Sequence, residues 1–191
     1  MIDAEGLDSL SMRKLAGRLG VSAMTLYGYV RTKEELLDAI AHSALSRLEH
    51  AARGDGAWAQ RLARTVTGLH ELLLAHPGVT QIIGARGVPI PALDGFREQL
   101  LSILDEAGLE VPDAVECVAL LMCYTFGFAA IEHDRRTMDP EVEASRLRGL
   151  SRTAYPQLVR AADVYAGHVT ADAFSAGLGH VIAGIAARAR S

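Results

Sequence analysis

Two tyrosines and a lysine, Tyr27, Tyr29 and Lys33, are the side chains in this sequence with the most evident chemical use. Phenolic hydroxyls and an ammonium group donate hydrogen bonds to phosphate oxygens. The chain carries a formal charge of −4, yet no acidic residue lies between Ser9 and Lys33. Because screening limits charge attraction to a Debye length of about 10 Å, this locally positive stretch matters more than the total charge. The stretch therefore predicts contact with the backbone of a nucleic acid.

Catalytic and metal-binding patterns are missing from the sequence. The seven histidines are scattered, and there is no H-E-x-x-H, no Gly-rich phosphate loop and no nucleophile elbow. Cys117 and Cys123 lack metal-ligand spacing and are expected to be a buried pair of free thiols. The run 132–134 is expected at the surface near a helix end, with a metal pair of His133 and Asp134 as the less favoured alternative. We therefore predict no enzyme activity, no cofactor and no metal.

The elements that position the two tyrosines follow a helix-turn-helix plan. Leu15 and Leu19 lie four apart and give a first helix one apolar side. Gly20 is suited to end that helix in a left-handed conformation, and Ser22 to cap the next helix, residues 23–29. In a helix-turn-helix the second helix enters the DNA major groove, so the motif at 11–30 predicts a DNA-binding unit.

A third helix is expected to link this motif to the rest of the chain. Thr32 and Glu35 fit a capping box that starts a helix at Lys33. Apolar residues then recur at three- and four-residue spacing to about Ala52. This linking helix, residues 33–52, would pack on the motif with its front half and on the following domain with its back half.

The stretch from Ser11 to Ile40 resembles the DNA-binding domain of the TetR family of transcriptional regulators. The pattern LA-x-x-LGVS-x-x-TLY followed by K-x-E-L-L carries the resemblance, which covers roughly the first quarter of the chain. The resemblance implies that Tyr27, Tyr29 and Lys33 contact phosphates and that residues 22–25 face the bases. The full set of predicted DNA-binding residues is Arg13, Ser22, Ala23, Met24, Thr25, Tyr27, Tyr29 and Lys33.

This recognition surface is poor in hydrogen-bond donors. Ala23, Met24 and Gly28 make no side-chain hydrogen bond to a base. We therefore expect sequence readout through Thr25, apolar contact with thymine methyl groups and DNA shape.

The sequence departs from the family at its start. Members have one more helix before the motif, and residues 2–7 resemble only its last turn and exit. The expectation is a chain that starts inside the domain or a variant without that helix. This leaves open an alternative function, a ligand-binding or sequestering protein with an incomplete DNA-binding unit. An ordinary helical bundle is the plainer interpretation of the first three helices.

The whole chain is predicted to be all-α, because no strand-length alternation of apolar residues occurs. Residues 54–56, Gly-Asp-Gly, mark the best boundary between a DNA-binding domain at 1–52 and a ligand-binding and dimerisation domain at 53–191. Helices are expected at 58–76, 96–107, 113–135 and 172–188. Shorter helical pieces are expected at 79–85 and from Met138, and Pro156 should interrupt the segment after 153.

Three of these helices would enclose an apolar cavity, which in the family binds an inducer. The candidate lining residues are Leu69, His70, Leu73, Phe96, Leu100, Leu121, Met122 and Phe126. For His70 a hydrogen-bonded helix histidine is the favoured alternative, and for the methionine and phenylalanines plain core packing is an equal one.

The helices at 113–135 and 172–188 carry more apolar surface than one domain of this size covers. They predict a two-fold homodimer through a four-helix contact, as the resemblance also implies. Burial against each other within a monomer is the alternative. The uncharged run 117–131 has 15 residues, fewer than the approximately 20 of a membrane span, so no membrane is expected.

The sequence therefore predicts a cytoplasmic, homodimeric transcriptional regulator. A repressor is favoured over an activator, bound to a near-palindromic double-stranded operator and released by a small-molecule inducer. The sequestering protein described above is the first alternative. A helical enzyme with an apolar substrate is the second, and it would need an acid–base pair inside the pocket.

Overall fold

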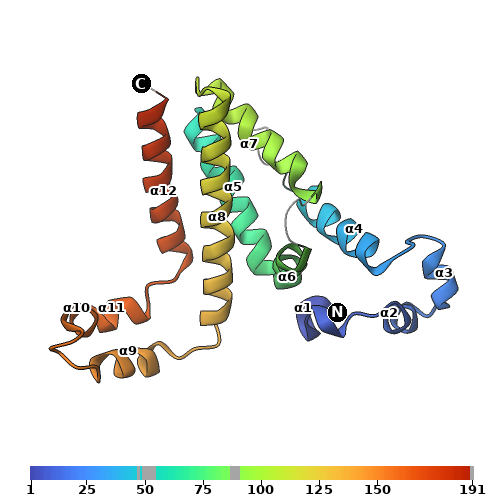
Figure 1. Ribbon diagram of the computed structural model, residues 1–191, viewed down its shortest axis with the longest axis horizontal. Coiled ribbons are helices and arrows are strands. Elements are labelled where there is room, and N and C mark those ends of the chain that lie inside the picture. The colour runs from blue at the N-terminus through green and yellow to red at the C-terminus, as the bar shows by residue number, and fades with distance from the viewer. Residues whose placement is uncertain (47, 49–54, 87–90, 190–191) are drawn as a thin grey trace.

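The computed structural model describes residues 1–46, 48, 55–86 and 91–189. All regular elements in these ranges are helical, as predicted. The elements are α1 Ile2–Glu5, η1 Leu7–Ser9, α2 Met12–Leu19, α3 Ala23–Tyr27, α4 Lys33–Leu45, α5 Trp58–Ala75, α6 Pro77–Arg86, η3 Pro91–Leu93, α7 Asp94–Glu106, α8 Val111–Arg135, α9 Pro140–Arg148, α10 Pro156–Arg160, α11 Ala162–Ala166 and α12 Ala171–Arg188. Figure 1 shows two parts, an N-terminal group of α1 to α4 and a larger C-terminal group of α5 to α12.

The local signals in the N-terminal group form as predicted. The hydroxyl oxygens of Ser22 and Thr32 accept hydrogen bonds from the backbone N–H groups of Thr25 and Glu35, at 3.1 and 3.0 Å. Gly20 ends α2 with φ 68°, in the left-handed region that glycine adopts at little cost. The capping box is shifted by one residue, because the Glu35 carboxylate accepts from the N–H of Arg31 rather than of Thr32.

The N-terminal group has a small core of its own. Ile2, Leu10, Leu37 and Ala41 are buried in it together with Ile82, which belongs to α6. The next buried residues along the chain, Leu45 and Leu48, belong to the larger core. The helix α4 therefore connects two cores, and α6 enters the smaller one.

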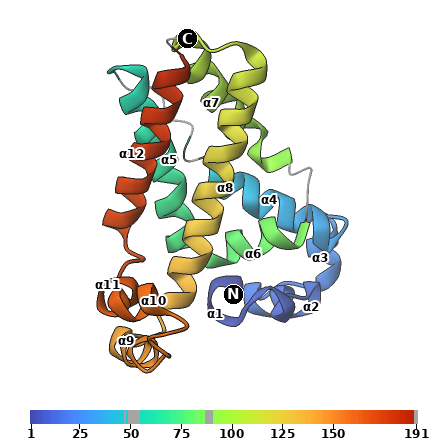
Figure 2. The ribbon, with the colours of Figure 1, turned by 60° about the vertical axis from the view of Figure 1, so that its left-hand side comes forward.

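The C-terminal group surrounds the larger core. Leu62 and Leu69 of α5, Leu100 of α7, Leu121 of α8 and Phe174 of α12 are each at most 1% exposed. In Figures 1 and 2, α12 runs antiparallel beside α8. The Tyr124 hydroxyl donates to the Phe174 carbonyl oxygen at 2.8 Å. A Cβ at Gly177 would collide with the Tyr124 side chain, so this close approach requires glycine.

Several boundaries differ from the sequence prediction. The helix predicted at 23–29 ends at Tyr27. The helix predicted at 33–52 is described to Leu45, and 47 and 49–52 lie outside the described residues, as do Gly54 of the predicted boundary and 87–90. Pro156 begins α10 instead of interrupting a segment, because a proline fits the first turn of a helix.

Three side-chain predictions were wrong. Leu19, predicted on an apolar packing side, is 59% exposed. Cys117 is buried, but Cys123 is exposed, so the two free thiols are not a buried pair. Glu132 was expected at the surface and is instead buried, while His133 and Asp134 are exposed.

The length argument that was applied to α8 needs correction, although the prediction of no membrane is not contradicted. Among the described residues, Val111–Arg135 is the one helix that is long and apolar enough to cross a membrane by length and composition, with mean hydropathy 1.9. The 15-residue run was too narrow a test, because short polar gaps lower hydropathy little. Only 33% of the most apolar 18-residue segment of this helix is buried. A core helix of a globular protein satisfies the same criterion, so this feature alone decides nothing.

Candidate nucleic-acid interface and ligand pocket

The candidate nucleic-acid surface is centred on α3. Figures 1 and 2 place this short helix at an outer edge of the molecule, away from α5, α8 and α12. The hydroxyls of Ser22 and Thr25 lie 2.9 Å apart, and Ser22 Oγ also accepts from the Thr25 N–H. This pair fixes the Thr25 side chain at the exposed start of α3.

Large side chains around α3 project into solvent. Met24 is 80% exposed, Tyr29 83% and Tyr27 47%. These side chains are therefore accessible to a binding partner. Arg13 on α2 is exposed, and Ala23 and Lys33 are half-buried. The eight predicted residues therefore lie on α2, α3 and the segment leading into α4, and their DNA contacts remain a prediction.

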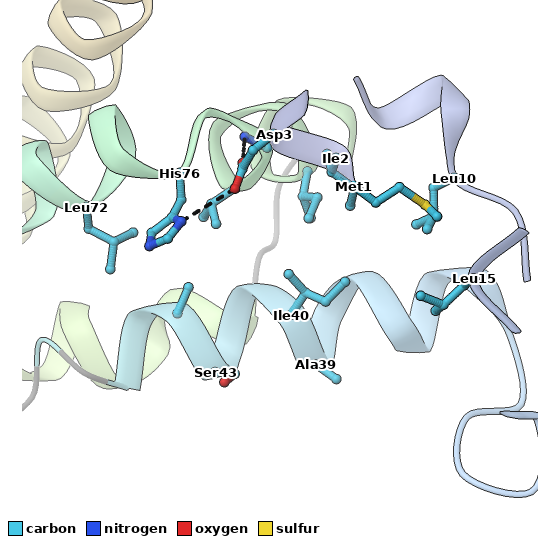
Figure 3. Close-up of a pocket in the computed structure, with 14 residues that line it drawn as sticks. Met1, Ile2, Asp3, Leu10, Leu15, Ala39, Ile40, Ser43, Leu72 and His76 are labelled. Carbon is cyan, nitrogen blue, oxygen red and sulfur yellow. Dashed lines mark hydrogen bonds and ion pairs between the residues drawn. The ribbon is translucent and has the colours of Figure 1, made fainter. Parts of the chain in front are cut away.

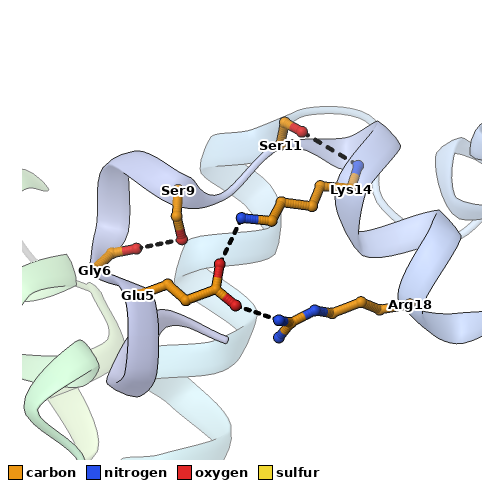
Figure 4. A network of polar contacts seen from close by, with 6 residues as sticks. All are labelled: Glu5, Gly6, Ser9, Ser11, Lys14 and Arg18. Atoms are coloured by element: carbon orange, nitrogen blue, oxygen red, sulfur yellow. Dashed lines mark hydrogen bonds and ion pairs between the residues drawn. The ribbon is translucent and has the colours of Figure 1, made fainter.

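A carboxylate from α1 forms ion pairs with two basic side chains of α2 (Figure 4). Glu5 accepts from Lys14 Nζ at 2.5 Å and also from the Arg18 guanidinium. The hydrogen bond from Lys14 is the main reason that the pKa of Glu5 is lowered. The ion pairs therefore persist at neutral pH and are lost as the pH falls through the lowered Glu5 pKa. Glu5 lies just before the acid-free stretch, so the sequence overestimated the free positive charge there.

The eight candidate pocket residues come from three neighbouring helices. Six of them, Leu69, His70, Leu73, Phe96, Leu100 and Leu121, are buried in the larger core. Met122 and Phe126 are half-buried and pack against it. A cavity of about 520 Å³ elsewhere, between the N-terminal and C-terminal groups, is lined by none of the eight. Their role in ligand binding stays a prediction.

His70 is the titratable member of this set and forms a buried pair. His70 Nε2 lies 3.0 Å from a carboxylate oxygen of Glu132 on α8. The imidazole also stacks on Phe174, with ring centroids 3.8 Å apart. Burial lowers the pKa of His70, and the Glu132 charge opposes that shift. The ring is thus neutral at pH 7, and its N–H donates to Glu132, which is the hydrogen-bonded histidine that the sequence favoured.

Two buried polar atoms near the pocket residues have no hydrogen-bond partner. Within the described chain these are Oγ1 of Thr65 on α5 and Oε1 of Gln99 on α7. Thr65 is only 1% exposed and lies one helical turn before Leu69. An unsatisfied buried hydroxyl costs about 1–3 kcal/mol, so both atoms would gain from a hydrogen-bonding ligand. No pattern in the sequence pointed to either atom.

Metal binding has no support in the described ranges. No group of three or more His, Cys, Asp or Glu residues there is arranged to hold a metal ion. The predicted minor pair of His133 and Asp134 gains no third ligand among these residues.

The comparisons with known proteins match both parts of the chain. Residues 1–40 match the family described as bacterial regulatory proteins, tetR family, and residues 50–189 match the tetracyclin repressor-like C-terminal domain. The chain belongs to the TetR family of transcriptional regulators.

Individual relatives agree with this assignment. The HTH-type transcriptional repressor DrrR1 of Streptomyces coeruleorubidus is 35% identical over 78% of this chain, which spans only 53% of that repressor. The class A tetracycline repressor protein from transposon 1721 of Escherichia coli is 30% identical over 98% of this chain and 86% of its own length. The crystal structure of Streptomyces coelicolor ActR with actinorhodin is 30% identical, covers 100% of this chain and 93% of the ActR chain, and superposes with a TM-score of 0.83.

These matches identify the chain as a ligand-responsive, DNA-binding transcriptional repressor of the TetR family. Members of this family are regulators, so the family assignment itself points away from catalysis. The N-terminal match ends within α4 and the C-terminal match begins beyond it.

Two substitutions separate phosphate contact from base readout. Lys33→Ala should weaken binding to every DNA sequence and reduce the slope of log affinity against log salt by about 0.9, the effect of one phosphate contact. Lys14→Ala is the matched control and should change the slope less, because Glu5 already holds that ammonium.

Thr25→Ala should instead lose about 1–3 kcal/mol of discrimination between operator and scrambled DNA. Fluorescence anisotropy at several salt concentrations measures both effects, and equal losses on all sequences for Thr25→Ala would contradict the readout.

Proposed function

We propose that this TetR-family chain acts as a cytoplasmic homodimer that holds a near-palindromic operator and releases it when a small molecule binds among α5, α7 and α8. The observation that carries the proposal is the position of α4. Leu37 and Ala41 of this helix are buried in the core of the DNA-binding group, and Leu45 is buried in the larger core. A displacement of the larger core is therefore passed directly to α3.

The unsatisfied Thr65 and Gln99 oxygens support a binding site in the larger core. They belong to α5 and α7, the helices that also carry five of the eight candidate pocket residues. A ligand that donates hydrogen bonds to both oxygens would remove their desolvation cost.

The ligand class that fits this site is a planar, multi-ring molecule with hydroxyl groups. ActR is described in complex with actinorhodin, and other relatives are tetracycline repressors. Hydroxyl donors on such a molecule would pair with the Thr65 and Gln99 oxygens, and its rings would stack on apolar walls.

An exposed apolar face of α8 and α12 supports the homodimer. Val115, Leu120 and Ile131 on α8 are each more than half exposed. On α12 a row of small exposed residues, which we name the α12 stripe, consists of Ala176, Gly179, Ala183, Gly184 and Ala187. Two such helices from each chain would pack as a two-fold four-helix contact, because small residues permit close approach.

The ligand proposal is tested by release of DNA. Labelled duplexes that tile the DNA flanking the gene are titrated with protein, and actinorhodin or tetracycline is then added as the probe. An effective inducer should raise the half-saturating protein concentration by about 5- to 150-fold, the range of typical coupling energies.

Thr65→Val identifies the site of that effect. It should reduce the response to the ligand and, by removing an unsatisfied buried hydroxyl, raise the thermal midpoint of the free protein. Thr67→Val, two residues along the same helix and half-buried, is the control and should do neither. A ligand response of wild-type size in Thr65→Val would contradict a ligand site at Thr65 on α5.

The dimer proposal is tested by a charge on the α12 stripe. Ala183→Glu should convert the sedimenting species from dimer to monomer, because a two-fold contact would bring two carboxylates together without partners. It should also abolish tight operator binding, since a monomer contacts one half-site. Ala85→Glu on the exposed side of α6 is the control and should sediment as wild type. A monomeric wild-type chain, or a dimeric Ala183→Glu variant, would contradict this contact.

A further inference from the structure

A smaller cavity lies where four helices meet at one end of the C-terminal group. It has a volume of about 290 Å³ and is walled by the end of α8, the start of α9, the end of α11 and the start of α12. Figures 1 and 2 show these segments together. The cavity of about 520 Å³ between the two groups of helices, shown in Figure 3, shares no lining residue with it. Neither Thr65 nor Gln99 lines it either, so it is separate from the ligand site proposed above.

Most polar side chains of this cavity wall already have partners. Glu143 accepts two hydrogen bonds from a guanidinium on its own helix, at 2.6 and 2.7 Å. Asp139 and Thr170 cap α9 and α12 by accepting from backbone N–H groups. The Arg135 guanidinium donates to two carbonyl oxygens at the end of α11, at 3.5 and 3.3 Å. These four side chains therefore maintain the wall and have little capacity left for a ligand.

Glu132 and Arg136 are the wall residues whose charged groups are incompletely paired among the described residues. Glu132 Oε2 lies 3.0 Å from His70 Nε2, but Oε1 lies 3.7 Å from Arg136 Nη2, which is longer than a hydrogen bond. The Glu132 side chain is only 10% exposed, whereas that of Arg136 is 54% exposed. Because a buried carboxylate is costly when its oxygens lack donors, Glu132 Oε1 would gain from a donor placed in the cavity.

A carboxylate beside a guanidinium matches the two charged ends of an α-amino acid. Glu132 Oε1 would accept from the α-ammonium group, and the Arg136 guanidinium would donate to the α-carboxylate. A simple amine would leave Arg136 unpaired, and a simple carboxylate would leave Glu132 unpaired. Met138, Pro140 and Val169 add apolar surface to the wall, as in small-molecule sites that combine apolar walls with a few polar groups. The cavity therefore favours an amino acid with an aliphatic side chain.

We propose that this cavity binds a free α-amino acid with an aliphatic side chain, whose ammonium pairs with Glu132 and whose carboxylate pairs with Arg136. The Arg136 side chain can turn outward to admit the ligand, because more than half of it is exposed. The other oxygen of Glu132 holds His70, whose ring stacks on Phe174 at 3.8 Å. A bound amino acid is thus linked through one carboxylate to a histidine of the larger core. The site goes beyond the proposed repressor function and does not depend on it.

Binding is tested by isothermal titration calorimetry of the full chain without DNA at pH 7, with L-leucine as the probe. One leucine should bind per chain. Isocaproate and isoamylamine keep the branched side chain but lack the ammonium and the carboxylate, respectively. Each should bind at least tenfold more weakly than leucine, because each leaves one charged group of the protein unpaired. No binding of leucine, or equal binding of leucine and either fragment, would overturn the proposal.

The variant Arg136→Ala locates the site. It should weaken leucine binding at least tenfold, yet it should not weaken the binding of isoamylamine, which has no carboxylate for Arg136 to hold. Arg160→Ala on α10 removes an exposed arginine outside the cavity wall and should bind leucine as wild type. The thermal midpoint establishes that each variant is folded. Leucine binding of wild-type strength in folded Arg136→Ala would contradict the assignment of this cavity.

The link through Glu132 has its own measurement. The imidazole proton resonance of His70, assigned by its loss in His70→Gln, should shift when leucine is added to the wild type and to Arg160→Ala. It should not shift in Arg136→Ala. His42 on α4 is outside the cavity wall, and its resonance should stay in place. An unshifted His70 resonance in protein saturated with leucine would show that the ligand does not engage Glu132.

Discussion

A carboxylate from the first helix caps the N-terminus of α6, and the placement of the DNA-binding group depends on this contact. Asp3 Oδ1 accepts from the Gly78 N–H at 2.7 Å, where the free N–H groups and dipole of α6 favour an anion. The two helices are so close that a Cβ at Gly78 would lie 2.6 Å from that oxygen and 2.7 Å from Ile2 Cγ2. A second bond, from the Leu7 N–H to Gln81 Oε1 at 2.9 Å, holds the same two segments. The contact thus ties α1 and η1 to the ligand-binding part of the chain.

The helices α4 and α6 together explain how a ligand in one part acts on DNA in the other. Ile82 of α6 is buried among residues of the N-terminal group, and Leu45 of α4 is buried in the larger core. Each group therefore contributes a side chain to the core of the other. A packed core has discrete arrangements rather than a continuous range, so in the proposed mechanism a shift of α5 or α6 around a ligand moves α4 as a unit. The surface at Thr25 moves with it, because α3 joins α4 through a short turn.

The sequence predicted the features that depend on neighbouring residues and missed those that depend on distant ones. Ser22, Thr32 and Gly20 were predicted correctly, since a cap or a left-handed turn is set within four residues. The hydrogen bond between Asp3 and Gly78 joins residues that are 75 positions apart in the sequence, and no local sequence pattern predicts it. Burial of Glu132 against His70 was missed for the same reason, because 62 residues separate them. No sequence pattern predicted the unsatisfied Thr65 hydroxyl, because a threonine in a helix cannot be distinguished by sequence from one that only packs.

The most direct test of this account is the operator affinity of Gly78→Ala. The added Cβ would lie under 3 Å from side-chain atoms of Asp3 and Ile2, so these residues of α1 must shift, while every residue of the DNA surface and of the core ligand site keeps its chemistry. Gly84→Ala on the same helix is the matched control, because a Cβ there meets nothing within 4 Å. If α6 positions the DNA-binding group, Gly78→Ala should bind operator at least about fivefold more weakly than wild type in anisotropy titrations, and Gly84→Ala should not differ. Equal operator affinity for folded Gly78→Ala and wild type would contradict the claim that this junction controls DNA binding.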